Sequence, residues 1–184
     1  MNFEKLNPNK ITAIRFCMAP IVFGCLLYPP MRAIAILAMV ISEASDIADG
    51  YIARKYNKTS VLGKVLDPIA DSLYHLTVFL AFAINGWMPY LFLSVFIGRD
   101  LISYTFRLIS FIKKSDPSAR KSGKIKAWAH GICQIGTVLL FWLFGRGDVT
   151  NALSLGLIVC ALMITIVSGI DYLRQTGRVF LGNA

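Results

Sequence analysis

Residues 46–71 read DIADGYIARKYNKTSVLGKVLDPIAD, and this stretch places four carboxylates in an otherwise apolar part of the chain. Residues three or four positions apart lie on the same face of an α-helix. Asp46 therefore shares a face with Asp49, and Asp67 shares a face with Asp71. The stretch therefore predicts two successive helices whose carboxylates face one point.

Four carboxylates that close together repel strongly in a low-dielectric surrounding unless cations lie between them. Oxygen ligands that bind a metal beside a phosphate favour Mg²⁺ or Mn²⁺ over zinc. The alternative is that these are helix-end charges paired with Arg54, Lys55 and Lys64. Because ionisable groups inside a membrane are expensive and usually functional, the metal site is the favoured interpretation.

The rest of the chain predicts an all-α integral membrane protein with a single domain, residues 1–184. Its mean hydropathy is +0.62 and 56% of its residues are hydrophobic, more than the roughly half that is typical of a soluble domain. Six apolar stretches approach the length of about 20 residues that spans a bilayer. They lie near residues 11–27, 31–51, 64–84, 88–112, 124–144 and 149–173. Residues 1–10 are expected to form a short interfacial helix.

The basic residues are divided unequally between the two sides of this predicted bundle. When the connecting segments alternate sides, one side carries fifteen lysines and arginines and the other carries only Arg32 and Arg146. The positive-inside rule then places both termini and the aspartates on the cytoplasmic side, with Arg54 and Gly63 in the loop between the second and third helices. The surplus positive charge suits anionic membrane lipids, so we expect no nucleic-acid partner.

The aspartate stretch resembles the signature of the CDP-alcohol phosphotransferase family, Asp-x-x-Asp-Gly-x-x-Ala-Arg, eight residues, then Gly-x-x-x-Asp-x-x-x-Asp. All eight defined positions are filled as the signature requires, by Asp46, Asp49, Gly50, Ala53, Arg54, Gly63, Asp67 and Asp71. Residues 7–15, 123–126 and 168–172 add a looser similarity to the phosphatidylglycerophosphate synthase branch.

Members of that family transfer a phosphatidyl or phosphoalcohol group from a CDP-linked donor to an acceptor hydroxyl and release CMP. The resemblance implies that Asp46, Asp49 and Asp67 are ligands of a two-metal centre, completed by Asp71. It also implies that Asp71 is the general base toward the acceptor. Positions that resemble those holding the CDP part of CDP-diacylglycerol are Gly50, Ala53, Arg54 and Gly63. By analogy, a homodimer in the bacterial cytoplasmic membrane is expected.

The fourth apolar stretch contains a second charged group, Arg99, Asp100 and Arg107. Arg99 and Arg107 are eight residues apart, close to two helical turns, so both can face one cavity. Together with Lys124 and Lys126 at the mouth of the fifth helix, they form a predicted pocket for an acceptor phosphate. An internal Arg99–Asp100 pair, or an Arg107 that snorkels toward the cytoplasm, remains the structural alternative.

This pocket and the resemblance favour glycerol 3-phosphate as the acceptor, which would give phosphatidylglycerophosphate. One residue departs from the pattern, because Ser72 follows the last aspartate where lysine is expected in this branch. That departure leaves inositol, inositol phosphate and phosphatidylglycerol open as acceptors.

Two other classes of function compete with the transferase. Four carboxylates inside a membrane can also line a divalent-cation transporter, but a conduit needs polar groups through the full depth, and these cluster on one side. A non-catalytic packing subunit would not need Arg54 and Gly63 beside the carboxylates. His75 and His130 are expected to be packed polar residues inside the bundle rather than metal ligands.

Overall fold

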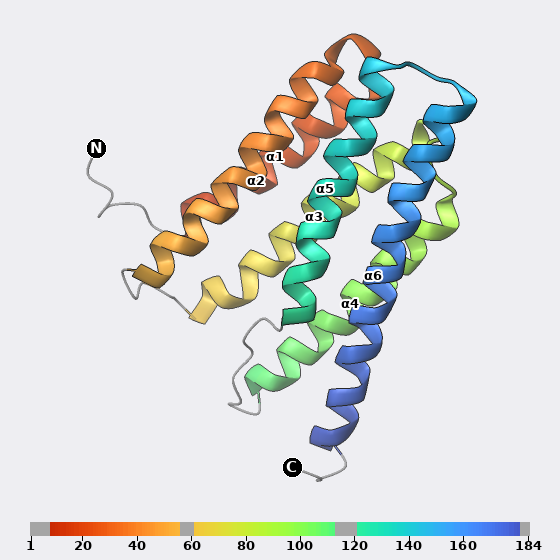
Figure 1. The fold of residues 1–184 in the computed structure, drawn as a ribbon. Coiled ribbons are helices and arrows are strands. Elements are labelled where there is room, and N and C mark those ends of the chain that lie inside the picture. Colours follow the sequence, from red (N-terminus) through yellow and green to blue (C-terminus); the bar gives the residue numbers. More distant parts are fainter. Residues whose placement is uncertain (1–7, 56–60, 113–120, 181–184) are drawn as a thin grey trace. The chain divides into compact units, whose positions relative to one another are not determined.

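The computed structural model describes residues 8–55, 61–112 and 121–180. Within these ranges it does not describe the side chains of residues 8–14, 46–55, 61–67, 107, 109–112, 121–122, 124 and 175–180. The described residues contain six α-helices, one 3₁₀ turn and no strand (Figure 1). The helices are α1 (Pro8–Leu27), α2 (Arg32–Lys55), α3 (Val61–Ile84), α4 (Tyr90–Ile112), α5 (Lys121–Leu143) and α6 (Asp148–Phe180), and η2 (Pro29–Met31) is the turn. The all-helical prediction is confirmed.

Helix α2 ends later along the chain, and helix α3 begins earlier, than the sequence predicted. Arg54 lies in the last turn of α2 and Gly63 in the first turn of α3, so placing them in the connecting loop was wrong. Arginine and lysine are good helix formers, and a run of charge at the end of an apolar stretch does not by itself end a helix. The predicted interfacial helix falls largely on residues 1–7, outside the described residues.

The chain divides into two compact units, Met1–Ala81 and Phe82–Ala184, and each is described by itself. In the first unit α1 packs against α2, and η2 joins them (Figure 1). Their shared core is small and apolar. It contains Ala19, Val22, Leu26, Ala35 and Met39, each at most 4% exposed.

In the second unit α6 packs against both α4 and α5. The face that α5 buries carries a polar stripe made of Lys126, His130, Gln134 and Thr137, which recur at helical spacing. His130 Nε2 lies 2.8 Å from Thr165 Oγ1 on α6, so part of this stripe is hydrogen-bonded across the helix interface. The buried face of α5 is therefore partly polar.

Large apolar side chains, by contrast, cover much of the outer surface of both units. Leu91, Phe144 and Val149 are more than 70% exposed, for example. Exposed apolar side chains of this number, with a buried polar stripe in the second unit, differ from the arrangement of a water-soluble domain. Among the described residues, Asp148–Arg174 of α6 is the one segment that is long and apolar enough by itself to cross a membrane. The number of membrane spans therefore stays a prediction.

The predicted turn at Asn85-Gly86 ends α3. Gly86 has a φ of 73°, a left-handed conformation that glycine adopts without strain. Its N–H donates to the Ala83 carbonyl, and the Trp87 N–H donates to the Phe82 carbonyl, which is the Schellman pattern. The Phe82 and Trp87 rings pack 5.2 Å apart beneath the turn. This contact fixes the direction in which the chain leaves α3 for α4.

Candidate functional site

Most of the predicted metal and CDP-donor residues lie on described helices, but their side chains are outside the described part of the structure. Those on α2 are Asp46, Asp49, Gly50, Ala53 and Arg54, and those on α3 are Gly63 and Asp67. Among the side chains that are described, no group of three or more His, Cys, Asp or Glu residues is arranged to hold a metal ion. The two-metal centre therefore stays a prediction, and Asp71 is its one member whose side chain is described.

Asp71 belongs to a charged cluster that joins the three helices of the first unit. Its Oδ1 atom lies 3.6 Å from Arg15 Nη1 on α1 and 3.3 Å from His75 Nε2, one turn further along α3. The same His75 nitrogen lies 3.9 Å from Glu43 Oε1 on α2. We call these four residues, Arg15, Glu43, Asp71 and His75, the Asp71 cluster.

The Asp71 cluster is partly open at its acidic side. The Asp71 and Glu43 side chains keep 27% and 31% of their surface exposed, whereas His75 is buried. A partly exposed carboxylate fits the hard oxygen ligands that Mg²⁺ and Mn²⁺ require. Asp71 therefore fits the metal centre predicted for it.

A second charged cluster lies inside the second unit, around Asp100 on α4. Lys126 Nζ on α5 donates to both oxygens of Asp100, at 2.7 and 3.0 Å. Arg99 donates from Nη1 to Asp100 Oδ1 at 2.9 Å, and from Nη2 to Ser168 Oγ on α6 at 2.6 Å. All three charged side chains are at most 9% exposed. We call Arg99, Asp100, Lys126 and Ser168 the Asp100 cluster.

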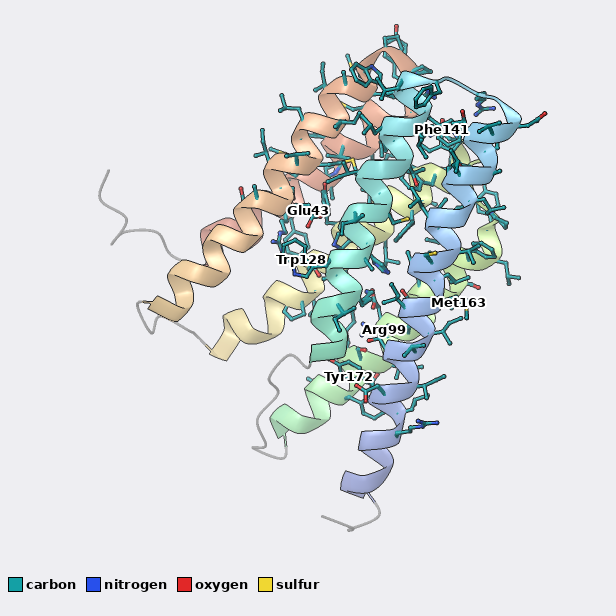
Figure 2. All side chains as sticks on the ribbon, viewed as in Figure 1. Glu43, Arg99, Trp128, Phe141, Met163 and Tyr172 are labelled. Atoms are coloured by element: carbon teal, nitrogen blue, oxygen red, sulfur yellow. The ribbon has the colours of Figure 1, made fainter. Side chains whose placement is uncertain are left out.

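Two glycines make room for the Arg99 side chain and the tyrosine beneath it. The Arg99 guanidinium carbon lies 5.1 Å from the centre of the Tyr172 ring, and Figure 2 shows the two side chains next to each other. A Cβ atom at Gly169 would lie 3.2 Å from Arg99 Cγ, and one at Gly123 would lie 3.2 Å from Tyr172 Oη. The segments 123–126 and 168–172 of the sequence resemblance thus meet around this arginine.

The structure brings together two of the four residues predicted to bind an acceptor phosphate. Arg99 and Lys126 share Asp100, while the side chains of Arg107 and Lys124 lie outside the described residues. The Arg99–Asp100 pair that the sequence left as an alternative is present. Lys126 was expected at the mouth of α5, but it is only 4% exposed, because the buried carboxylate of Asp100 draws it inward.

Of the partners of Asp71 and Asp100, the sequence predicted only Arg99, as an alternative. Glu43 lies three residues before Asp46 on α2, so its spacing was a usable signal. Arg15 was counted among the cytoplasmic charges and in the segment 7–15 of the resemblance, and His75 was predicted as a packed polar residue. Ser168 begins the segment 168–172 of the resemblance, but its bond to Arg99 was not predicted, because it joins residues far apart in the sequence.

Comparisons with known proteins point to one family. A sequence model of the CDP-alcohol phosphatidyltransferase family matches residues 5–167. A CDP-diacylglycerol–glycerol-3-phosphate 3-phosphatidyltransferase of Bacillus subtilis is 31% identical over 182 residues, which cover 91% of this chain and 93% of that protein. A protein of the same name from Mycoplasma genitalium is 37% identical over 109 residues, 58% of this chain and 45% of that protein.

A putative cardiolipin synthase of Mycobacterium bovis is 36% identical over 95 residues, which cover 52% of this chain and 46% of that protein. The chain thus spans about half the length of the Mycoplasma and Mycobacterium relatives, but almost the whole of the Bacillus protein. The family match includes both the Asp71 cluster and Arg99, Asp100 and Lys126 of the other cluster.

Proposed function

Because this chain belongs to the CDP-alcohol phosphatidyltransferase family, we propose that it transfers a phosphatidyl group from CDP-diacylglycerol to an acceptor hydroxyl and releases CMP. The membership confirms the family predicted from residues 46–71. The acceptor we propose is glycerol 3-phosphate, which gives phosphatidylglycerophosphate in membrane phospholipid synthesis. The observation that carries this proposal is the complete eight-position motif on α2 and α3.

The proposed setting is a bacterial cytoplasmic membrane that all six helices cross. Helices of 20 to 33 residues are long enough for this, at about 1.5 Å per residue against a hydrocarbon core of about 30 Å. Their exposed apolar side chains would face lipid. The excess of basic residues then orients both termini and the aspartate motif toward the cytoplasm, where CDP-linked donors and phosphorylated acceptors are dissolved or presented.

Asp46, Asp49, Asp67 and Asp71 are the residues that would hold two Mg²⁺ or Mn²⁺ ions. Bound there, the metals would offset the charge of the donor pyrophosphate and of the departing CMP. The small residues Gly50, Ala53 and Gly63 would let the cytidine diphosphate approach the helix backbones closely, since they have little or no side chain in the way. Arg54 would supply a guanidinium to the pyrophosphate oxygens.

Asp71 is the proposed general base. As the acceptor oxygen attacks the phosphatidyl phosphorus, Asp71 takes the hydroxyl proton, and the bond from that phosphorus to the CMP oxygen breaks. Arg15 and His75 approach the same Asp71 oxygen from two helices and so fix the direction of the carboxylate. Their role in this proposal is to position the base rather than to react.

Arg99, Arg107, Lys124 and Lys126 are the proposed ligands of the acceptor phosphate. The charges of Arg99, Lys126 and Asp100 sum to +1, which is too little to balance a phosphate dianion. Arg107 and Lys124 would raise that charge to +3, which is why all four cations are assigned to the pocket. Guanidinium groups bind phosphate through paired N–H donors in a fixed geometry.

Phosphatidylglycerol is the second candidate acceptor. Ser72, which stands beside Asp71 in place of the expected lysine and is buried on α3, leaves this acceptor open. The Mycobacterium relative is named as a putative cardiolipin synthase. Inositol and inositol phosphate would use the same chemistry. A divalent-cation transporter is the non-enzymatic alternative, since carboxylates in a membrane also occur in ion pathways.

One assay tests the proposal. The purified protein is supplied with CDP-diacylglycerol and Mg²⁺ or Mn²⁺, and CMP release is measured with glycerol 3-phosphate, phosphatidylglycerol, inositol and inositol phosphate in turn. We expect the fastest release with glycerol 3-phosphate. Faster release with another acceptor would change the assignment of the acceptor, and no release with any of them would contradict the transferase.

A further inference from the structure

The carboxylate of Asp100 accepts three hydrogen bonds from two cationic side chains deep inside the second unit. It receives two from Lys126 and one from Arg99, at 2.7 to 3.0 Å, and it is only 2% exposed. A single anion thus compensates both cations, which is the arrangement that a phosphate oxygen would also make with them. Without Asp100, two buried cations would lie side by side without a counter-charge, which is strongly unfavourable.

Two polar groups beside this cluster point to a further ligand. Arg99 Nε is buried and has no hydrogen-bond partner among the described residues, although both terminal nitrogens of the same guanidinium are bonded. The hydroxyl of Ser103, one turn further along α4, is also buried and has no partner there. Buried donors are nearly always hydrogen-bonded, so two such groups on one helix face indicate an acceptor that enters from outside the chain.

We propose that Asp100 is an internal counter-ion that stands in for the phosphate group of a phosphate-monoester ligand. Asp100 holds Lys126 and Arg99 through the hydrogen bonds that it accepts from them. On binding, the phosphate oxygens take over hydrogen bonds from these cations, and the Ser103 hydroxyl and Arg99 Nε–H donate to the phosphate as well. This inference rests on the proposed function, because it assigns the phosphate to the acceptor glycerol 3-phosphate.

Charge explains why such a residue is useful. The four predicted phosphate ligands carry +4, and Asp100 reduces this sum to +3. A bound phosphate dianion then leaves +1, close to neutrality. The carboxylate therefore offsets part of the charge of the cations, and it also competes with the ligand, so that it sets how tightly a phosphate binds.

The test is the thermal stability of Asp100→Asn in detergent, with and without phosphate. The variant keeps the shape of the side chain but removes its charge, so its apparent Tm should fall by about 5–15 °C in phosphate-free buffer. Inorganic phosphate or glycerol 3-phosphate, at millimolar concentration, should restore at least half of that loss by binding the folded state. Potassium chloride at equal ionic strength should not restore it.

Two controls separate this effect from simple loss of an ion pair. Asp100→Asn/Lys126→Met keeps the wild-type net charge, so it should be more stable than the single variant and should not respond to phosphate. Asp148→Asn removes an exposed carboxylate at the start of α6 and should not change the Tm. An Asp100→Asn protein that does not respond to phosphate would overturn the inference, as would one rescued only by micelles containing phosphatidylglycerol.

Ser103→Ala provides a readout that does not depend on the folding of the Asp100 variant. Because the hydroxyl has no partner among the described residues, its removal should leave the Tm unchanged. The KM for glycerol 3-phosphate should rise about 2- to 10-fold, with the KM for CDP-diacylglycerol constant. An unchanged acceptor KM in an active enzyme would refute the inference while leaving the proposed reaction intact, whereas a wild-type protein that is inactive with every acceptor would refute the reaction.

Discussion

The Asp71 cluster and the Asp100 cluster contain the same kinds of charged group, but they are built in opposite ways. Around Asp71 two carboxylates approach one histidine, one of them also approaches an arginine, the separations are 3.3 to 3.9 Å, and the carboxylates are partly exposed. Around Asp100 two cations share one carboxylate, the hydrogen bonds are 2.6 to 3.0 Å, and all the charged groups are buried.

The difference shows what each cluster is suited to receive. A pair of partly exposed carboxylates attracts a cation, whereas an excess of buried cation attracts an anion. A transferase that joins a CDP-linked donor to a phosphorylated acceptor needs both kinds of site. The predictions that follow separate the two clusters by changing one at a time.

The largest effect on activity is expected at Asp71, the proposed general base. Asp71→Asn keeps the shape of the side chain but cannot accept the acceptor proton, so kcat should fall by about 10²- to 10⁴-fold. The Tm should fall less than in Asp100→Asn, because the Asp71 side chain is 27% exposed whereas Asp100 is buried. Initial rates of CMP release, with Asp148→Asn as the matched control, provide the measurement. Near-normal turnover in Asp71→Asn would exclude Asp71 as the base.

A smaller and more selective effect is expected at the proposed phosphate ligands. Arg107→Ala should raise the KM for glycerol 3-phosphate by about 10- to 150-fold, because a hydrogen bond to a charged group contributes about 1.5–3 kcal/mol. The KM for CDP-diacylglycerol should stay constant. Arg146→Ala is the control, since this exposed arginine bonds to the Asn85 carbonyl in a turn.

Arg99→Ala tests whether Arg99 binds the acceptor phosphate or only stabilises the packing of α4 against α6. Arg99 contacts Asp100, Ser168 and Tyr172, so its loss should lower the Tm as well as raise the acceptor KM. A lower Tm with equal damage to both substrate KM values would show that Arg99 only holds α4 and α6 together.

The smallest effect is expected at His75. Its ring nitrogen lies 3.3 Å from Asp71, so His75→Leu should lower kcat by about 2- to 10-fold through loss of a positioning contact. His75→Gln retains a donor and should recover part of the rate. Equal rates in His75→Leu and the wild type would show that His75 fills space and does not position Asp71.

The sequence predicted the helices well because their causes are local. Apolar stretches and the turn at Asn85-Gly86 located the helices and the end of α3, and the left-handed glycine bears this out. The errors lie at the ends next to basic residues, where Arg54 and Gly63 proved helical. Arginine and lysine are compatible with both a helix and an interfacial loop, so hydropathy alone cannot place that boundary.

The candidate site was predictable only where a motif names its residues. The spacing of the aspartates predicted Asp71 as a site residue, which stays a prediction, and adjacency in the sequence suggested the Arg99–Asp100 pair, which the structure shows. The bonds from Lys126 to Asp100 and from Arg99 to Ser168 join different helices. No local pattern encodes such contacts, because they arise from the packing of α6 against α4 and α5.

The most direct test measures whether labelled acceptor is incorporated into lipid. Purified protein, CDP-diacylglycerol and radiolabelled glycerol 3-phosphate are incubated with Mg²⁺ or Mn²⁺, with and without a chelator, and label in the organic phase is compared with CMP released. We expect equal amounts of lipid-borne label and CMP, both abolished by chelation. Transfer that persists in the chelator would contradict the metal centre, and CMP release without label in lipid would contradict glycerol 3-phosphate as the acceptor.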